Sequence, residues 1–208
     1  MTSLLHISAS PRGDRSHSQA IARLFLETYR DSNPSHSIDT IDLWNHELPP
    51  LDAAAIEAKY AVLRKLPHSD EQAKAWSAIV NEAGRLSSYD KLLFSVPMWN
   101  WSVPFVLKRF IDVVTQPGVL FEWSPQTGYV GLLKKPVAVV YSSSFSYADG
   151  GEMQYFDHQK NYFEHWLNVI GCNDISTMTI APTAAAGDVL LAAKDLASKQ
   201  AKNLARRF

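Results

Sequence analysis

The segment Lys91–Val114 reads KLLFSVPMWNWSVPFVLKRFIDVV. Its first part, Lys91–Val96, is short and apolar, as expected for a strand that is buried in a parallel sheet. From about Pro104 to Thr115, apolar residues recur at three- and four-residue spacing, which predicts an amphipathic helix. Prolines bracket the stretch between them, so Ser95–Pro104 contains a shaped loop rather than a continuing strand. A strand, an aromatic loop and a helix in this order indicate one unit of an α/β fold.

The same alternation of strands and helices runs through the rest of the chain. Apolar or alternating runs predict further strands at Ser3–Ser8, Ser37–Leu43, Pro136–Val140 and Cys172–Ile180. One helical pattern begins near Ser18. Four others cover about Ala53–Leu63, Ser69–Ser87, Gln154–Ile170 and Asp188–Arg206. The runs Val119–Trp123 and Gly128–Leu132 flank SPQT and predict a short hairpin. We therefore expect a single domain, residues 1–208, with an open five-stranded parallel sheet and helices on both faces.

Composition excludes several classes of protein. The chain has 208 residues, of which 46% are hydrophobic and 20% are charged, and its formal net charge is −1. A nucleic-acid-binding protein would show a basic excess, so we expect no nucleic-acid partner. Cys172 is the single cysteine, which excludes an intrachain disulfide and a cysteine-based metal site. No apolar run approaches the roughly 18 residues of a membrane span, so we expect a cytoplasmic protein without a membrane partner.

Three unusual loops follow predicted strands. They are Ala9–Ser18 (ASPRGDRSHS), Pro97–Pro104 (PMWNWSVP) and Tyr141–Gly151 (YSSSFSYADGG). Right-handed crossovers place the loops after parallel strands at the carboxyl edge of the sheet, where ligands of open α/β folds bind. The sequence therefore predicts that the three loops form one site.

The first loop has the residues of an anion site. A strand, a small polar loop and a helix start present backbone N–H groups to an anion. The hydroxyls of Ser10, Ser16 and Ser18 can add hydrogen bonds, and Arg12 can add charge. The chain lacks GxxxxGK[ST] and GxGxxG, so neither a nucleoside triphosphate P-loop nor a Rossmann turn is supported. The alternative is that Ser16 or Ser18 only caps the helix.

The three loops together favour a phosphorylated, planar cofactor. The first loop suits a phosphate, the second offers a flat aromatic and amide lining, and the third offers hydroxyls and backbone groups. Flavin mononucleotide (FMN) satisfies all three. Backbone groups of Pro97–Trp101 and the Asn100 side chain can provide the donors and acceptors that one edge of its ring requires.

Three motifs give the chain a resemblance to a known family. Ser10 with SHS at Ser16–Ser18, then PMWNWSVPFVLKRFID, then KKPVAVVYSSS, resemble the FMN-dependent NADH azoreductases and NAD(P)H quinone reductases. The resemblance covers nearly the whole chain. It implies a flavodoxin-like three-layer sandwich with strand order 2-1-3-4-5, NADH or NADPH as electron donor, and a quinone or azo acceptor. It also implies a homodimer with the active site at the interface.

The resemblance also assigns roles to residues. It places FMN against Ser10, Ser16, His17, Ser18, Met98, Trp99, Asn100, Trp101, Ser142, Ser143, Ser144 and Phe145, to which the reasoning from the residues adds Arg12 and Pro97. Phe121 would stack near the substrate, in a segment that resembles a gating loop. The chain departs from the family pattern at Trp99 and Trp101, where relatives carry tyrosine and phenylalanine. It departs again at SSSF, where relatives carry SRGG and where glycine would let backbone approach the flavin closely.

The implied chemistry is a ping-pong reaction in which a hydride passes through flavin N5, and no protein group acts as nucleophile or metal ligand. The alternative is a flavodoxin-like electron carrier or a flavin-binding regulatory protein. Electron carriers of that kind are strongly acidic, and the net charge of −1 does not favour one. His158 and His165 lie seven residues apart in one predicted helix, with Glu164 beside them, but a metal site is not favoured because no further ligand is evident. Trp44 is interpreted as a packing or interface residue.

Overall fold

Five parallel strands form the central sheet of the computed structural model, which describes residues 1–208. They are β1 (Ser3–Ser8), β2 (Ser37–Asp42), β3 (Lys91–Pro97), β6 (Val137–Ser142) and β7 (Ile175–Ile180). Their order across the sheet is β2-β1-β3-β6-β7, which is the order 2-1-3-4-5 when only the strands of this sheet are counted. The predicted flavodoxin-like topology is thus confirmed.

The central strands are buried on both faces, which explains why their sequences are apolar without alternation. Ile7 of β1 lies between Ile41 of β2 and Phe94 of β3 in the parallel register. Phe94 in turn pairs with Val139 of β6. All four of these hydrophobic side chains are buried.

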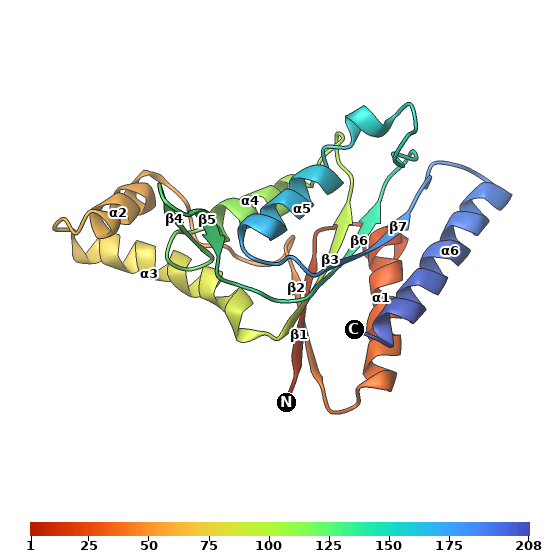
Figure 1. Cartoon of the computed structure of the whole chain (residues 1–208), viewed down its shortest axis with the longest axis horizontal. Helices are drawn as coiled ribbons and strands as arrows, with labels where there is room; N and C mark the ends of the chain where they lie inside the picture. Colours follow the sequence, from red (N-terminus) through yellow and green to blue (C-terminus); the bar gives the residue numbers. More distant parts are fainter.

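Helices cover both faces of the sheet (Figure 1). On one face, α1 (His17–Ser32) and α6 (Asp188–Ala205) lie side by side and enclose a core cluster of 15 buried residues. The other face carries α3 (Asp70–Arg85), α4 (Phe105–Val114) and α5 (Lys160–Val169), over a cluster of 28 buried residues. The three layers of the predicted sandwich are therefore present, with the larger core on the α4 side.

Two elements lie outside these layers. Helix α2 (Ala53–Leu63) packs on α3 through a small cluster of its own that includes Trp76. Strands β4 (Phe121–Ser124) and β5 (Gly128–Gly131) form the antiparallel hairpin that the sequence predicted. A Cβ on Gly131 would lie 2.0 Å from the backbone N of Gly171, so glycine is required for this close approach of the two segments.

The prediction of one helix over Gln154–Ile170 is wrong at its start. Residues Gln154–Phe156 form a short 3-10 turn, and the α-helix begins only at Lys160. The Asp157 carboxylate accepts hydrogen bonds from the N–H groups of Gln159 and Lys160, at 2.9 and 2.8 Å. Such a side chain satisfies the first free donors of a helix, so it sets a new helix start within the predicted one.

None of the helices is both long and apolar enough to cross a membrane.

A buried histidine lies in the middle of the sheet. The His6 side chain is 5% exposed, and its Nε2 lies 3.0 Å from Ser95 Oγ. Its Nδ1 lies 3.5 Å from Thr40 Oγ1. Burial lowers the pKa of His6 from 6.5 to about 4, against a smaller opposing effect of the Asp42 carboxylate. His6 is therefore neutral in the folded protein at neutral pH.

We expect this histidine to make the fold acid-sensitive. Well above pH 6.5, His6 is neutral in both the folded and the unfolded chain, so it does not lower the free energy of unfolding. Between pH 6.5 and about 4 the unfolded chain binds a proton that the folded chain does not, so the free energy of unfolding falls by roughly 3 kcal/mol. Urea unfolding of the wild type and of His6→Gln at pH 7, 5.5 and 4.5 measures this loss as the difference between their pH profiles.

The matched control is His68→Gln, because His68 is exposed. This variant should keep the acid sensitivity of the wild type, whereas His6→Gln should lose that part of it. Equal pH profiles for wild type and His6→Gln would contradict the burial argument.

Candidate functional site

Backbone hydrogen bonds draw the three predicted loops together at the carboxyl edge of the sheet. The Ala9 N–H donates to the Ser95 carbonyl at 3.1 Å, so the first loop starts beside the end of β3. The Met98 N–H donates to the Ser142 carbonyl at 2.7 Å, so the second loop starts beside the third. The structure thus brings the predicted loops to one place, as the parallel topology requires.

The first loop carries hydroxyls that are buried but only partly hydrogen-bonded. Ser16 is the N-cap of α1, and its Oγ accepts from the Gln19 N–H at 3.3 Å. Ser18 Oγ lies 3.3 Å from Ser16 Oγ, and Ser10 is 2% exposed beside them. The Gln19 side chain donates to the Ser10 carbonyl at 2.9 Å and holds the loop against the helix. The capping role of Ser16 is therefore confirmed, while anion binding by Ser10 and Ser18 stays a prediction.

Positive charge surrounds this helix start. His17 is the first residue of α1, and its pKa is lowered by burial and by the nearby charges of Lys194 and Arg12. Those charges add to the free N–H groups and the positive end of the helix dipole. The sequence did not point to Lys194, because it comes from α6, more than 170 positions along the chain from His17. An anion is the ligand that such a field favours.

The second loop contains a tight turn with unusual backbone angles. The Trp99 and Ser102 N–H groups donate to each other's carbonyls at 2.9 and 3.0 Å. Between them, Asn100 and Trp101 have φ values of 46° and 66°. Two positive φ angles define a type I′ turn. Asparagine tolerates this region, but tryptophan does so only with strain.

A cluster of three aromatic rings supports the second loop. The Trp99 ring lies 5.4 Å from the Trp44 ring, and the Phe105 ring stands edge-on to Trp44 at 5.2 Å. The Trp44 indole N–H donates to the Ala9 carbonyl at 3.0 Å. The interpretation of Trp44 as a packing residue is thus confirmed, but the sequence interpretation missed that Trp44 joins the aromatic loop to the first loop. Its position just after β2, at the same sheet edge, was the signal that could have identified it.

The third loop is fixed at its start and exposed at its tip. Ser142 and Ser143 are buried, and Ser143 Oγ donates to the Phe145 carbonyl at 2.7 Å. The Ser143 carbonyl accepts from both the N–H and the hydroxyl of Thr183. Ser144 and the Phe145 side chain are exposed, the latter by 57%. Of the four predicted residues Ser142–Phe145, the first two are therefore buried and the last two are exposed.

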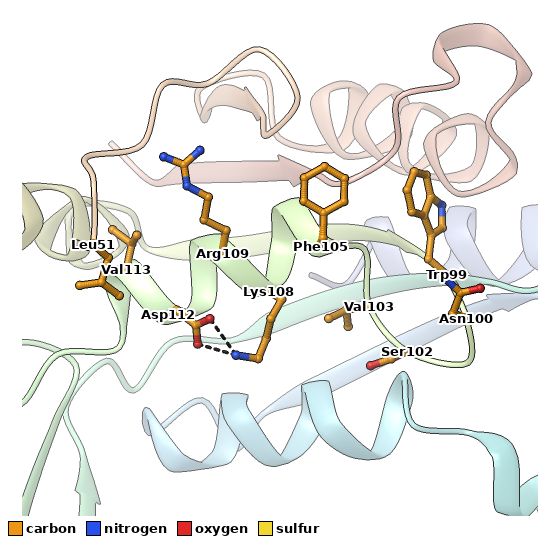
Figure 2. Close-up of a pocket in the computed structure, with 10 residues that line it drawn as sticks. All are labelled: Leu51, Trp99, Asn100, Ser102, Val103, Phe105, Lys108, Arg109, Asp112 and Val113. Carbon is orange, nitrogen blue, oxygen red and sulfur yellow. Dashed lines mark hydrogen bonds and ion pairs between the residues drawn. The ribbon is translucent and has the colours of Figure 1, made fainter. Parts of the chain in front are cut away.

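A groove of about 820 Å³ adjoins the second loop along α4 (Figure 2). Phe105 and Arg109 point to the same side of α4 as Trp99, and the Arg109 guanidinium donates to the Leu48 carbonyl at 3.1 Å. On the opposite side of the helix, Lys108 pairs with Asp112 at 2.6 Å. Phe105 is 62% exposed although its ring contacts Trp44, so this helix presents a large apolar surface to the groove.

Phe121 does not join the aromatic rings of the three loops. It lies in β4, and its ring packs on Tyr129 of β5 at 5.4 Å. Its proposed contact with a substrate stays a prediction.

The residues at the edge fit FMN in kind and in place. Buried hydroxyls and positive charge form one end of the site, and the turn Trp99–Ser102 forms the flat side next to it. Ser142 lies on the other side, where its carbonyl accepts a hydrogen bond from the Met98 N–H. No group of three or more histidine, cysteine, aspartate or glutamate side chains is placed to hold a metal ion.

Comparison with known proteins gives matches over the whole chain. The sequence profile of a family described as having a flavodoxin-like fold matches residues 2–204. An FMN-dependent NADH:quinone oxidoreductase of Desulfotalea psychrophila is 40% identical over 209 residues, covering 98% of each chain. The FMN-dependent NADH:quinone oxidoreductase 3 of Pseudomonas fluorescens is 39% identical and covers 100% of this chain and 98% of that protein.

Solved structures share the fold. The crystal structure of an azoreductase from Bacillus anthracis superimposes with a TM-score of 0.91 over 100% of both chains, at 24% identity. An FMN-dependent NADH-azoreductase from Bacillus anthracis, in complex with FMN, gives a TM-score of 0.88 over 100% of this chain and 99% of that one, at 23% identity.

Proposed function

This chain belongs to the flavodoxin-like family of FMN-dependent NADH:quinone oxidoreductases, and we propose that it binds FMN and uses NADH to reduce quinones or azo compounds. One observation carries the proposal. The helix start with its hydroxyls and positive charges lies at the same sheet edge as the aromatic turn, so a phosphate and a flat ring can be held together.

The first loop would bind the phosphate. The hydroxyl groups of Ser10 and Ser18 would donate hydrogen bonds to the phosphate, together with the free N–H groups at the start of α1. Arg12 would add charge, whereas His17, whose pKa is lowered by burial and by Lys194 and Arg12, would offer a ring N–H rather than a charge. Ser16 would keep its capping bond to Gln19 and so hold the helix start in place.

The other two loops would hold and orient the ring. Pro97–Trp101 would contribute backbone groups and the Asn100 amide, and Ser142–Phe145 would close the opposite side. When bound, FMN supplies the redox chemistry, because it accepts a hydride from NADH and passes two electrons to the acceptor. The protein groups would exclude water and present one open face to the two substrates in turn, which predicts ping-pong kinetics. NADPH is an alternative donor, and a cytoplasmic location is part of the proposal.

The direct test mixes the FMN-loaded protein with NADH under anaerobic conditions and then adds a quinone (menadione) or an azo dye (methyl red). We expect NADH to bleach the flavin band and the acceptor to restore it, with steady-state turnover well above that of free FMN. Failure to bind FMN would refute the proposal. Binding and bleaching without acceptor turnover would instead support the electron-carrier alternative.

The phosphate site predicts discrimination between FMN and riboflavin, which lacks the phosphate. We expect Ser10→Ala and Ser18→Ala to weaken FMN binding about tenfold or more each, because a hydrogen bond to a charged group contributes about 1.5–3 kcal/mol. Riboflavin affinity should stay within about twofold. Fluorescence titration of the apoprotein measures both. Ser88→Ala, at an exposed serine far along the chain, is the control and should change neither affinity.

Exposed aromatic side chains support the homodimer as part of the same proposal. Phe105 is 62% exposed on α4, Trp101 is 52% exposed in the turn, and Tyr155 is 88% exposed before α5. Aromatic side chains are enriched in the cores of protein interfaces. A second copy that covered α4 and its groove would bury Phe105 and close the open side of the flavin site.

Replacement of Phe105 tests the dimer. We expect Phe105→Glu to raise the dimer dissociation constant at least about 30-fold, because a buried charge replaces an aromatic anchor. Tyr60→Glu, which changes an exposed aromatic on α2, should leave the dimer intact. Analytical ultracentrifugation measures both. A monomeric wild type, or a dimeric Phe105→Glu of unchanged affinity, would contradict the proposed interface.

A further inference from the structure

The glutamine at the start of α5, Gln159, is buried although its side chain is polar. It is 2% exposed, and its Nε2 donates to the Val96 carbonyl at 2.9 Å. Val96 lies at the end of β3, directly before Pro97, where the predicted ring-binding loop begins. This hydrogen bond therefore joins α5 to the base of that loop, across 63 positions of the chain.

Gln159 occupies the N-cap position of α5 but does not cap the helix. Its side chain makes no capping hydrogen bond, and the Asp157 carboxylate accepts from the Gln159 and Lys160 N–H groups instead. Short polar side chains are favoured at N-caps because they reach the free N–H groups, and burial of a long polar side chain costs rotamer entropy. The helix start thus does not explain a glutamine at this position, whereas the hydrogen bond to Val96 does.

The residue before Gln159 is bound to the turn of the same loop. The His158 N–H donates to the Trp101 carbonyl at 3.0 Å, and the Ser102 hydroxyl donates to the His158 carbonyl at 3.3 Å. Trp101 has a φ of 66°, a conformation that the surrounding structure has to impose on a non-glycine residue. The segment Asp157–Gln159 is therefore hydrogen-bonded both before the loop and within its turn.

We propose that Gln159 is a positioning residue for the flavin ring, because its amide fixes the end of β3 from which Met98–Trp101 extend. Gln159 lines one pocket with Met98 and Ser143, so its side chain lies beside both loops that are expected to contact the ring. It acts through the loop rather than by contact with the flavin. The inference rests on the proposed function, but the position of the loop can also be measured in the protein without flavin.

Two substitutions of similar volume remove the amide donor. Gln159→Met has no polar group, and the ionised carboxylate of Gln159→Glu can only accept hydrogen bonds. A protonated carboxyl can donate to the Val96 carbonyl, so Gln159→Glu should regain the wild-type behaviour in acid. A role in packing alone would give no such recovery.

The surroundings decide where the introduced carboxyl titrates. The other titratable side chains that line the same pocket are Tyr141, Tyr147, Asp149, Asp157, Lys160 and Glu164. Burial raises the pKa of the introduced carboxyl, and the three neighbouring carboxyl groups raise it further, whereas Lys160 alone opposes them. The carboxyl should therefore be neutral at pH 5.5 and ionised at pH 8, and every comparison is made with the wild type at the same pH.

Hydrogen exchange of the flavin-free protein, followed by mass spectrometry, measures the loop directly. We expect peptides that cover residues 98–103 to exchange about fivefold faster in Gln159→Met at both pH values, and in Gln159→Glu at pH 8 only. Peptides from β1 should exchange as in the wild type, since a general loss of stability would accelerate both regions. Asn203→Asp, at an exposed amide in α6, is the control and should change neither region. Unchanged exchange at residues 98–103 in Gln159→Met would overturn the inference.

Flavin titration tests the consequence for the ring. In Gln159→Met, the affinities for FMN and for riboflavin should fall by the same factor, about fivefold, because both ligands share the ring. The visible circular dichroism of the bound flavin should change with them, and Gln159→Glu should match the wild type at pH 5.5 only. Weakening of FMN alone, or wild-type affinities and spectra in both variants, would overturn this inference alone. A wild type that binds no flavin would instead refute the proposed function.

Discussion

The hydrogen bond from the Met98 N–H to the Ser142 carbonyl, 2.7 Å long, continues the β3–β6 ladder one residue past the end of β3. Because the strands are parallel, the loops that follow them all lie at the carboxyl edge of the sheet. The bond couples two loops that are more than 40 positions apart in the chain. The second and third loops both start at this pairing.

The aromatic turn is the strained part of this arrangement. Trp101 has a φ of 66°, a conformation that costs a non-glycine residue of order 1–3 kcal/mol. Its carbonyl accepts from the His158 N–H at 3.0 Å, and the Ser102 hydroxyl donates to the His158 carbonyl at 3.3 Å. The segment before α5 therefore holds the turn in a shape that its own sequence does not favour.

The sequence was sufficient for most of the fold, because apolar strands such as Ser3–Ser8 and capped helices such as the one from Ser69 carry strong local patterns. It failed over Gln154–Ile170, where one side-chain cap at Asp157 outweighed the helical periodicity. At the site, it identified the loops but missed Trp44 and Lys194. These side chains come from distant elements, and only the folded packing brings them to the loops.

The third loop shows how this chain manages without the glycines of the family pattern. Ser143 donates to the Phe145 carbonyl, and its own carbonyl accepts twice from Thr183, so side-chain and backbone hydrogen bonds set the loop path. A glycine loop would approach a ring through flexible backbone, whereas this loop is fixed at Ser143 and free only at its tip. If FMN binds as proposed, the exposed Phe145 ring, rather than bare backbone, would face the space beside it. Selectivity for the acceptor at that end should therefore depend on aromatic packing more than on backbone hydrogen bonds, because a ring excludes water and offers no donor.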